Sequence, residues 1–289
     1  MSIFGEKHYY HLYSEGRQEE VLFESNSEFV DGMNLVGTVA CKTGIRVMAF
    51  CLMNTHFHFV VHGSEEDVEE FASKVSQMYM LRRKSWDMCG VEPVRIDWNA
   101  KLLSENEYLQ TAIGYVVRNS MEITNKIAVT DYPWSSAGLY FRGREFWQYV
   151  KGRYRKAGEY TVRELYRILG SRVVIPDNWL IVNDSYIWPG NYVDITGCEG
   201  IFGSYSSFMF FVIAKAKRNA DEFRCYNSRI LMPDTEVREV ARSIADELYG
   251  LRDLRSLDLE KRKAVALQLV SRLGCKEKQI ERVMHLKKG

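Results

Sequence analysis

The sequence predicts an α+β fold, and three observations lead to that prediction. Short apolar and aromatic segments over 7–13, 45–53 and 56–62 are typical of strands. Apolar residues recur at helical spacing over 25–39 and 64–88. The last quarter of the chain has the pattern of helices throughout. Together these patterns predict a region of sheet and helices followed by a mainly helical region.

The expected elements of the first half follow the order strand, helix, strand, strand, helix, strand and helix. Asn54-Thr55 joins two strands so closely that they form a hairpin. A short strand is expected over 94–98, and a capping-box pattern at 104–107 begins a helix that extends to 125. This order resembles a ferredoxin-like, split βαβ layout with one helix added.

Three further helices are expected, over 235–248, 258–272 and 276–284. Gly274 lies at the break between the last two, and a helix, a short turn with glycine and a second helix form the helix-turn-helix plan. We therefore expect a first domain over 1–150 and a helical, helix-turn-helix-like DNA-binding region over 234–289. Residues 151–233 connect the two, and their pattern assigns no fold.

The composition excludes several classes of protein. Of the 289 residues, 46% are hydrophobic and 27% are charged, which is typical of a globular chain and excludes wholesale disorder. None of the six cysteines forms a CxxC pair, so neither a zinc ribbon nor a thioredoxin-type site is indicated. No apolar run reaches the ~18 residues that span a bilayer, and no signal-peptide pattern is present. We expect a cytoplasmic protein without a membrane partner.

The charge divides unevenly along the chain. Residues 1–150 carry 14 basic and 20 acidic side chains, a net charge of −6, whereas residues 151–289 carry 25 and 18, a net charge of +7. Any general affinity for nucleic acid is therefore expected in the second half.

His56-Phe57-His58 is the most informative triplet. Side chains alternate across a strand, so the two histidines point to one face at a separation of ~6–7 Å, from which two imidazoles can converge on a metal ion. The spacing is common by chance, and the alternative is that both histidines are surface or strand-pairing residues.

Tyr115 and Asn119 are four residues apart on the helix expected over 104–125, so they share a face. A phenol beside an amide oxygen suggests a nucleophile next to a third metal ligand. The chain has 17 tyrosines, so such a pair is nearly expected by chance, and the alternative for Tyr115 is a packing residue.

Three stretches resemble sequence blocks of the single-tyrosine HUH transposases, in the same order. Residues 51–61 (CLMNTHFHFVV) resemble the family block YCLMPNHVHLLV, residues 114–120 (GYVVRNS) resemble RYIHLNPV, and residues 131–136 (DYPWSS) resemble YPWSS. The resemblance is to the REP-associated tyrosine transposases, in a longer subgroup with a C-terminal helix-turn-helix or DnaA-like region. It covers residues 7–140 well and the remainder loosely.

The resemblance implies an HUH nuclease domain with a catalytic helix added to the ferredoxin-like fold. His56, His58 and Asn119 would bind one divalent metal ion, Mg²⁺ or Mn²⁺. Tyr115 would attack a DNA phosphate and form a 5′-phosphotyrosine, which a second 3′-hydroxyl can reverse to join strands. The implied function is a metal-dependent endonuclease and strand transferase for single-stranded or hairpin DNA, acting as a monomer or homodimer in transposition.

Two groups of residues are candidates for DNA contact. Arg82, Arg83 and Lys84 form a basic cluster that either follows the phosphates or is a solvated helix face. Gln279 and Arg282 share a helix face and, with Lys278, would contact duplex flanks from a recognition helix in the major groove. The alternative for the last helices is a bundle that only packs on the first domain.

Two other functions stay open. The departures from the family pattern at Asn54-Thr55, where the family has a proline, and at Ser120 are compatible with a catalytically weakened, domesticated DNA-binding regulator. An unrelated metal-dependent hydrolase would use the two histidines with an activated water. Only the transposase leaves a covalent protein–DNA adduct, and Tyr108 is the second candidate for its nucleophile.

Overall fold

The structure is a computed structural model of the 289-residue chain. It describes residues 6–14, 21–84, 96–104, 106–123, 128–142, 154–215, 234–273 and 277–286. These residues form an α+β structure with antiparallel sheets, and the later part is mainly helical, as the sequence predicts. None of the helices in these ranges is long and apolar enough to cross a membrane.

Four strands form an antiparallel sheet in the order β2-β3-β1-β4. They are β1 (His8–Ser14), β2 (Arg46–Leu52), β3 (Phe57–Gly63) and β4 (Trp98–Leu103). The expected order of strands and helices is confirmed. The last strand is expected over 94–98, but β4 begins at Trp98. It pairs with β1 from Trp98, opposite Ser14, to Leu103, opposite Tyr9.

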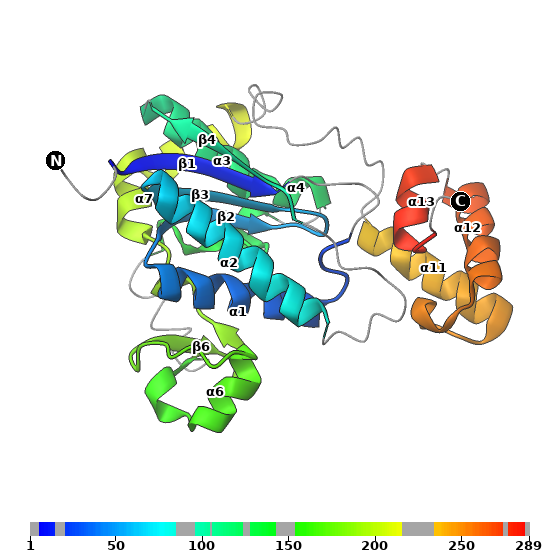
Figure 1. The fold of residues 1–289 in the computed structure, drawn as a ribbon. Coiled ribbons are helices and arrows are strands. Elements are labelled where there is room, and N and C mark those ends of the chain that lie inside the picture. The colour runs from blue at the N-terminus through cyan, green and yellow to red at the C-terminus, as the bar shows by residue number, and fades with distance from the viewer. Residues whose placement is uncertain are drawn as a thin grey trace.

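Helices cover both faces of this sheet (Figure 1). They are α1 (Asn26–Thr43), α2 (Glu65–Arg83), α3 (Asn106–Arg118) and the short α4 (Ser120–Ile123). Neighbouring residues of β3 point to opposite faces, so they identify the helix on each side. The ring of Phe59 contacts Phe71 of α2, whereas the ring of His58 contacts Tyr115 of α3. The α1–α2 pair therefore packs on one face and α3 on the other.

Local capping residues set the ends of α1 and α2. The Ser25 side chain accepts a hydrogen bond from the backbone N–H of Glu28, and α1 ends at Gly44, whose φ of 69° lies in the left-handed region that glycine favours. Ser64 and Asp67 form a capping box at the beginning of α2. These helix ends thus follow from sequence signals within a few residues.

The chain between 154 and 215 adds a second sheet and more helices. Its strands pair antiparallel in chain order: β5 (Tyr154–Lys156), β6 (Leu180–Val182) and β7 (Tyr186–Ile187). Its helices are α6 (Val162–Leu169), α7 (Ile195–Phe202) and α8 (Tyr205–Phe210). Helix α8 continues as π-helix over Phe211–Lys215. Turns of 3-10 helix lie at Val129–Asp131, Ala137–Leu139, Ala157–Glu159, Pro189–Asn191 and, further on, Leu254–Ser256.

This segment shares the core of the first sheet. The buried side chain of Asn34 on α1 accepts a hydrogen bond from the backbone N–H of Ile187 and donates to the carbonyl of Ser185. Ile187 and Phe208 are completely buried in the same cluster as the residues of β2 and β3. The described part of 151–233 is therefore packed structure, a feature that the sequence pattern did not assign.

Three helices at the expected places make up the C-terminal part: α11 (Asp234–Tyr249), α12 (Leu259–Leu273) and α13 (Glu277–Val283). They lie to one side of the sheet (Figure 1). They bury an apolar cluster of their own, with Val237, Ile244, Leu269 and Ile280 among its members.

The first core predicts a clear contrast between two side chains. Phe59 is completely buried, whereas Leu81 on α2 is 68% exposed. We expect Phe59→Ala to lower the free energy of unfolding by about 3–5 kcal/mol, because it removes a ring from a packed core. Leu81→Ala serves as the control and should change it by less than about 0.5 kcal/mol. Urea denaturation measures both, and similar losses in the two variants would contradict this core.

Candidate functional site

His56 immediately precedes β3 and His58 lies within it, and their rings lie on the same side of the strand. The two ring centroids are 4.7 Å apart and the ring planes are nearly perpendicular. Phe57, between them, points the other way and is completely buried in the core. Strand alternation thus brings two imidazoles together on the face that α3 covers.

Tyr115 and Asn119 approach His58 from α3 and its C-terminal end. The Tyr115 ring lies edge-on to His58, with a centroid distance of 5.5 Å. Asn119 follows the last residue of α3, and its side-chain amide donates to the carbonyl of Tyr115 at 2.9 Å. Both side chains are nearly buried, at 4% and 2% exposure. The structure therefore brings together the four residues that the sequence singles out for catalysis.

A third histidine, which the sequence analysis did not identify, completes the cluster. His11 lies on β1 and is completely buried. Its Nε2 atom is 3.2 Å from Nδ1 of His58, and its ring lies 5.9 Å from that of Tyr115. Thr55 has a similar place beside the other histidine, because its Oγ1 atom is 2.9 Å from Nδ1 of His56. The strand predicted over 7–13 includes His11, but the sequence does not show which residue of another strand lies beside His11.

Burial keeps the three imidazoles neutral. It lowers the pKa of His11 to about 3, with a smaller contribution from the positive charge of Lys101. It lowers the pKa of His56 to about 4, and the charge of Arg282 adds to the effect. The pKa of His58 lies well below its usual value through burial and the two neighbouring histidines, and a contact with Asn119 opposes that shift. Neutral imidazoles carry the lone pair that a metal ion requires.

The donor set fits a hard or borderline divalent cation. Oδ1 of Asn119 is buried, and the Asn119 side chain contacts the His58 ring. Two neutral imidazoles and an amide oxygen suit Mn²⁺ well and Mg²⁺ acceptably, and both ions retain waters or substrate oxygens as further ligands. Among the described residues, no group of three His, Cys, Asp or Glu side chains is arranged to hold a metal. The amide of Asn119, which contacts His58, is the group beside the two imidazoles that could act as a third ligand.

The basic cluster at the end of α2 is mostly turned inward, which corrects the expectation that it follows the phosphates or forms a solvated helix face. Arg82 pairs with Asp31 at 3.4 Å. Arg83 is 5% exposed and donates to the carbonyl of Val21 at 2.8 Å. Lys84 alone of the three is exposed.

The last helix also differs from the expected recognition helix. Gln279 and Arg282 share a face, as expected, but that face is buried: both side chains donate to Asp234, the first residue of α11. The geometry of these helices therefore turns both residues away from solvent, and they hold α13 against α11. The side chain of Lys278 lies outside the described residues.

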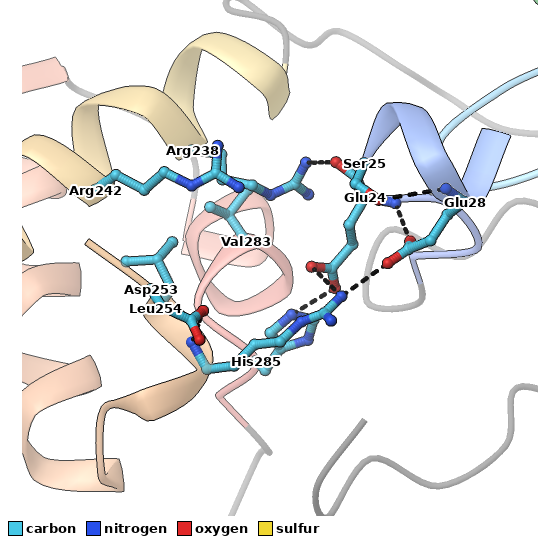
Figure 2. A pocket seen from close by; sticks show the side chains of 10 residues that line it. Glu24, Ser25, Glu28, Arg238, Arg242, Asp253, Leu254, Val283 and His285 are labelled. Atoms are coloured by element: carbon cyan, nitrogen blue, oxygen red, sulfur yellow. Dashed lines mark hydrogen bonds and ion pairs between the residues drawn. The ribbon is translucent and has the colours of Figure 1, made fainter. Parts of the chain in front are cut away.

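A cluster of charged residues around Glu24 holds the C-terminal helices against the first part of the chain (Figure 2). The Glu24 carboxylate lies 3.2 Å from Arg255 and 2.6 Å from His285, and its backbone carbonyl accepts a hydrogen bond from Arg238. Arg255 also pairs with Glu28 of α1 at 2.9 Å. Part of the positive charge of the second half thus faces acidic residues of the first half.

Comparison with known proteins gives one structural likeness. No protein-family profile matches the sequence, and no curated protein matches it. Among solved structures, the chain is similar to a REP-associated tyrosine transposase bound to a REP hairpin. The identity is 12%, the TM-score is 0.37, and the alignment covers 48% of this chain and 81% of the other.

The Glu24 cluster predicts how the docking of the C-terminal helices depends on pH. Burial alone raises the pKa of Glu24, but the hydrogen bond to His285 and the charges of His285, Arg238 and Arg255 lower it to about 2, from an ordinary value of 4.5. Because the pKa is lower in the folded chain, the ionised carboxylate stabilises the fold fully above pH 4.5, and this contribution is lost as the pH falls toward 2.

We expect Glu24→Gln to lower the free energy of unfolding by about 3 kcal/mol at neutral pH, since it leaves buried basic groups without their carboxylate. The difference from the unmodified protein should shrink between pH 4.5 and 2 in urea denaturation. Glu239→Gln is the matched control, because Glu239 pairs with Arg242 on the surface and should contribute less than about 0.5 kcal/mol. A difference that stays constant over this pH range would show that the carboxylate does not act through its charge.

Proposed function

We propose that this protein is a metal-dependent single-stranded DNA endonuclease and strand transferase of the single-tyrosine HUH type. The observation that carries the proposal is the cluster of His56, His58, Tyr115 and Asn119, which come from separate parts of the sequence and meet on one face of the sheet. The strand order β2-β3-β1-β4, with α1 and α2 as connections, is compatible with the ferredoxin-like fold of that family.

The three sequence blocks that resemble the REP-associated tyrosine transposases also support the proposal, because they are neighbours in space. The first block forms the end of β2 and the beginning of β3, and the second forms the end of α3. The third lies against β2: the hydroxyl of Tyr132 donates to the carbonyl of Leu52, and the backbone N–H of Leu52 donates to the carbonyl of Trp134. The third block thus fixes the strand end that leads to the histidines.

The departures from the family pattern have structural roles beside the site. Asn54 donates to the carbonyl of Phe23 and Thr55 contacts Nδ1 of His56. Ser120 donates to the carbonyl of Val117 at the end of α3. These residues stabilise the turn and the helix end that present the site, so they are compatible with an active enzyme.

The proposed reaction is a phosphoryl transfer to Tyr115. A metal ion held by His56, His58 and Asn119 would polarise the scissile phosphate and stabilise the charge that develops on its oxygens. The phenol of Tyr115 loses its proton and its oxygen attacks phosphorus. The bond from phosphorus to the 3′ oxygen breaks, and that oxygen takes up a proton and leaves as a 3′-hydroxyl. The phosphotyrosine conserves the phosphoester bond, so a second 3′-hydroxyl can attack it and join strands without ATP.

A non-catalytic DNA-binding regulator is the second candidate function. Its support is burial: His56 is 3% exposed and Tyr115 is 4% exposed. A DNA strand reaches the phenol only after neighbouring chain moves aside. The enzyme and the regulator differ in one observable, which is the covalent adduct.

We expect the purified full-length protein, with Mn²⁺ and a labelled hairpin from repeats near its gene, to form an adduct that resists denaturation. Tyr115→Phe should abolish the adduct, by more than about 100-fold, while DNA binding persists, because only a hydroxyl is lost. Tyr108→Phe is the matched control on the same helix and should retain the adduct. His58→Ala should prevent cleavage through loss of a metal ligand.

The adduct is measured by gel electrophoresis under denaturing conditions, and peptide mapping locates its attachment. An adduct that persists in Tyr115→Phe would refute the assigned nucleophile. Tight binding of the hairpin with no adduct in the unmodified protein would favour the regulator.

A further inference from the structure

We infer that His11 is a positioning residue, which holds His58 in the tautomer that presents Nε2 to a divalent cation. The inference rests on the proposed metal site and extends it by a residue from another strand. Its basis is the contact between Nε2 of His11 and Nδ1 of His58, at 3.2 Å.

The register of the sheet creates this contact. Tyr13 of β1 lies opposite His58 of β3, and His11 lies opposite Val60. His11 is therefore the diagonal neighbour of His58 on the same face, at a separation that long and aromatic side chains can bridge. The two rings are nearly parallel, with an interplanar angle of 14°.

Two neutral imidazoles can form this hydrogen bond in two ways. In the first, Nδ1 of His58 carries the proton and donates to Nε2 of His11. In the second, His11 donates, and the proton of His58 lies on Nε2, where it blocks metal binding. Only the first arrangement leaves a lone pair on Nε2 of His58.

His56 has a comparable arrangement, which is compatible with the first alternative for His58. Its Nδ1 atom lies 2.9 Å from the hydroxyl of Thr55, a group that can accept a hydrogen bond from Nδ1–H or donate one to Nδ1. Both histidines thus have Nδ1 beside a protein group that can accept a hydrogen bond, so each could offer Nε2 to the same ion. Histidines that bind metals usually donate their other ring N–H to such a partner, which fixes tautomer and ring orientation.

The alternative is that His11 only fills space in the sheet. An apolar ring of similar size would then fill the same space. It would leave one buried N–H of His58 without an acceptor, but it would not change metal binding. The two roles differ in their effect on metal affinity. A positioning residue changes the affinity for the ion, whereas a packing residue changes stability alone.

Mn²⁺ binding to the full-length protein, measured by calorimetry without DNA, separates these roles. We expect His11→Phe to weaken Mn²⁺ binding by about 10–100-fold, because the acceptor for His58 is lost. The Mn²⁺ affinity of His11→Gln should remain within about threefold of that of the unmodified protein, since the amide oxygen of glutamine can accept the same hydrogen bond from His58. His62→Phe is the matched control, because His62 lies four residues beyond His58 on β3 and its ring contacts Tyr9, and it should leave the affinity unchanged.

The tautomer itself gives a second readout. The chain has six histidines, so selective ¹⁵N labelling of their rings yields a small set of NMR signals. We expect His58 to carry its proton on Nδ1 in the metal-free protein, and His11→Phe to convert it to a mixture of tautomers. A proton on Nε2 of His58 in the unmodified protein would overturn the inference even if a variant fails to fold.

The experiments also separate this inference from the proposed function. If His58→Ala abolishes Mn²⁺ binding and His11→Phe does not weaken it, the role of His11 is refuted and the metal site stands. If both variants lose affinity but no DNA adduct forms, the role of His11 stands and the proposed nuclease activity is refuted. If His58→Ala binds Mn²⁺ normally, both the site and the role of His11 are refuted.

Discussion

The pairing of β1 with β3 is the constraint on which the rest of the structure depends. In its register, Leu12 faces Phe59 on the side of the core, and Tyr13 faces His58 on the side of α3. Side chains alternate in a strand, so a slip of one residue would exchange the two faces. It would place Leu12 among the imidazoles and His11 in the apolar core. One register thus produces both the hydrophobic core and the polar cluster.

Contacts between its members lower the cost of burying the polar cluster. An imidazole without a hydrogen bond is expensive to bury, and a charged one more so. Here His58 has His11, His56 has Thr55, and low pKa values keep the rings uncharged. Neutral imidazoles could bind a cation without first losing protons. The same features that make burial tolerable therefore suit the proposed metal site.

Charge shapes the molecule in a second way, through contacts within the chain. The sequence divides into an acidic first half and a basic second half, a pattern that favours nucleic acid as a partner for the second. In the structure, Arg238 and Arg255 face Glu24, and Arg282 faces Asp234. The net charge of the second half therefore overstates the positive surface that it offers to DNA. Lys263 in the second half is exposed, but its ammonium pairs with Glu260 at 2.9 Å.

The sequence by itself determined the features that depend on neighbours along the chain. It predicted the strands and helices and the common face of His56 and His58, because periodicity acts over a few residues. The tertiary structure decided which face meets which partner. His11 became a neighbour of His58 through a strand register that joins residues 47 positions apart, and α13 turned Gln279 and Arg282 inward toward Asp234. The spacing of residues along a helix or strand shows which side chains share a face. The contacts of that face depend on packing between segments that are distant in the sequence.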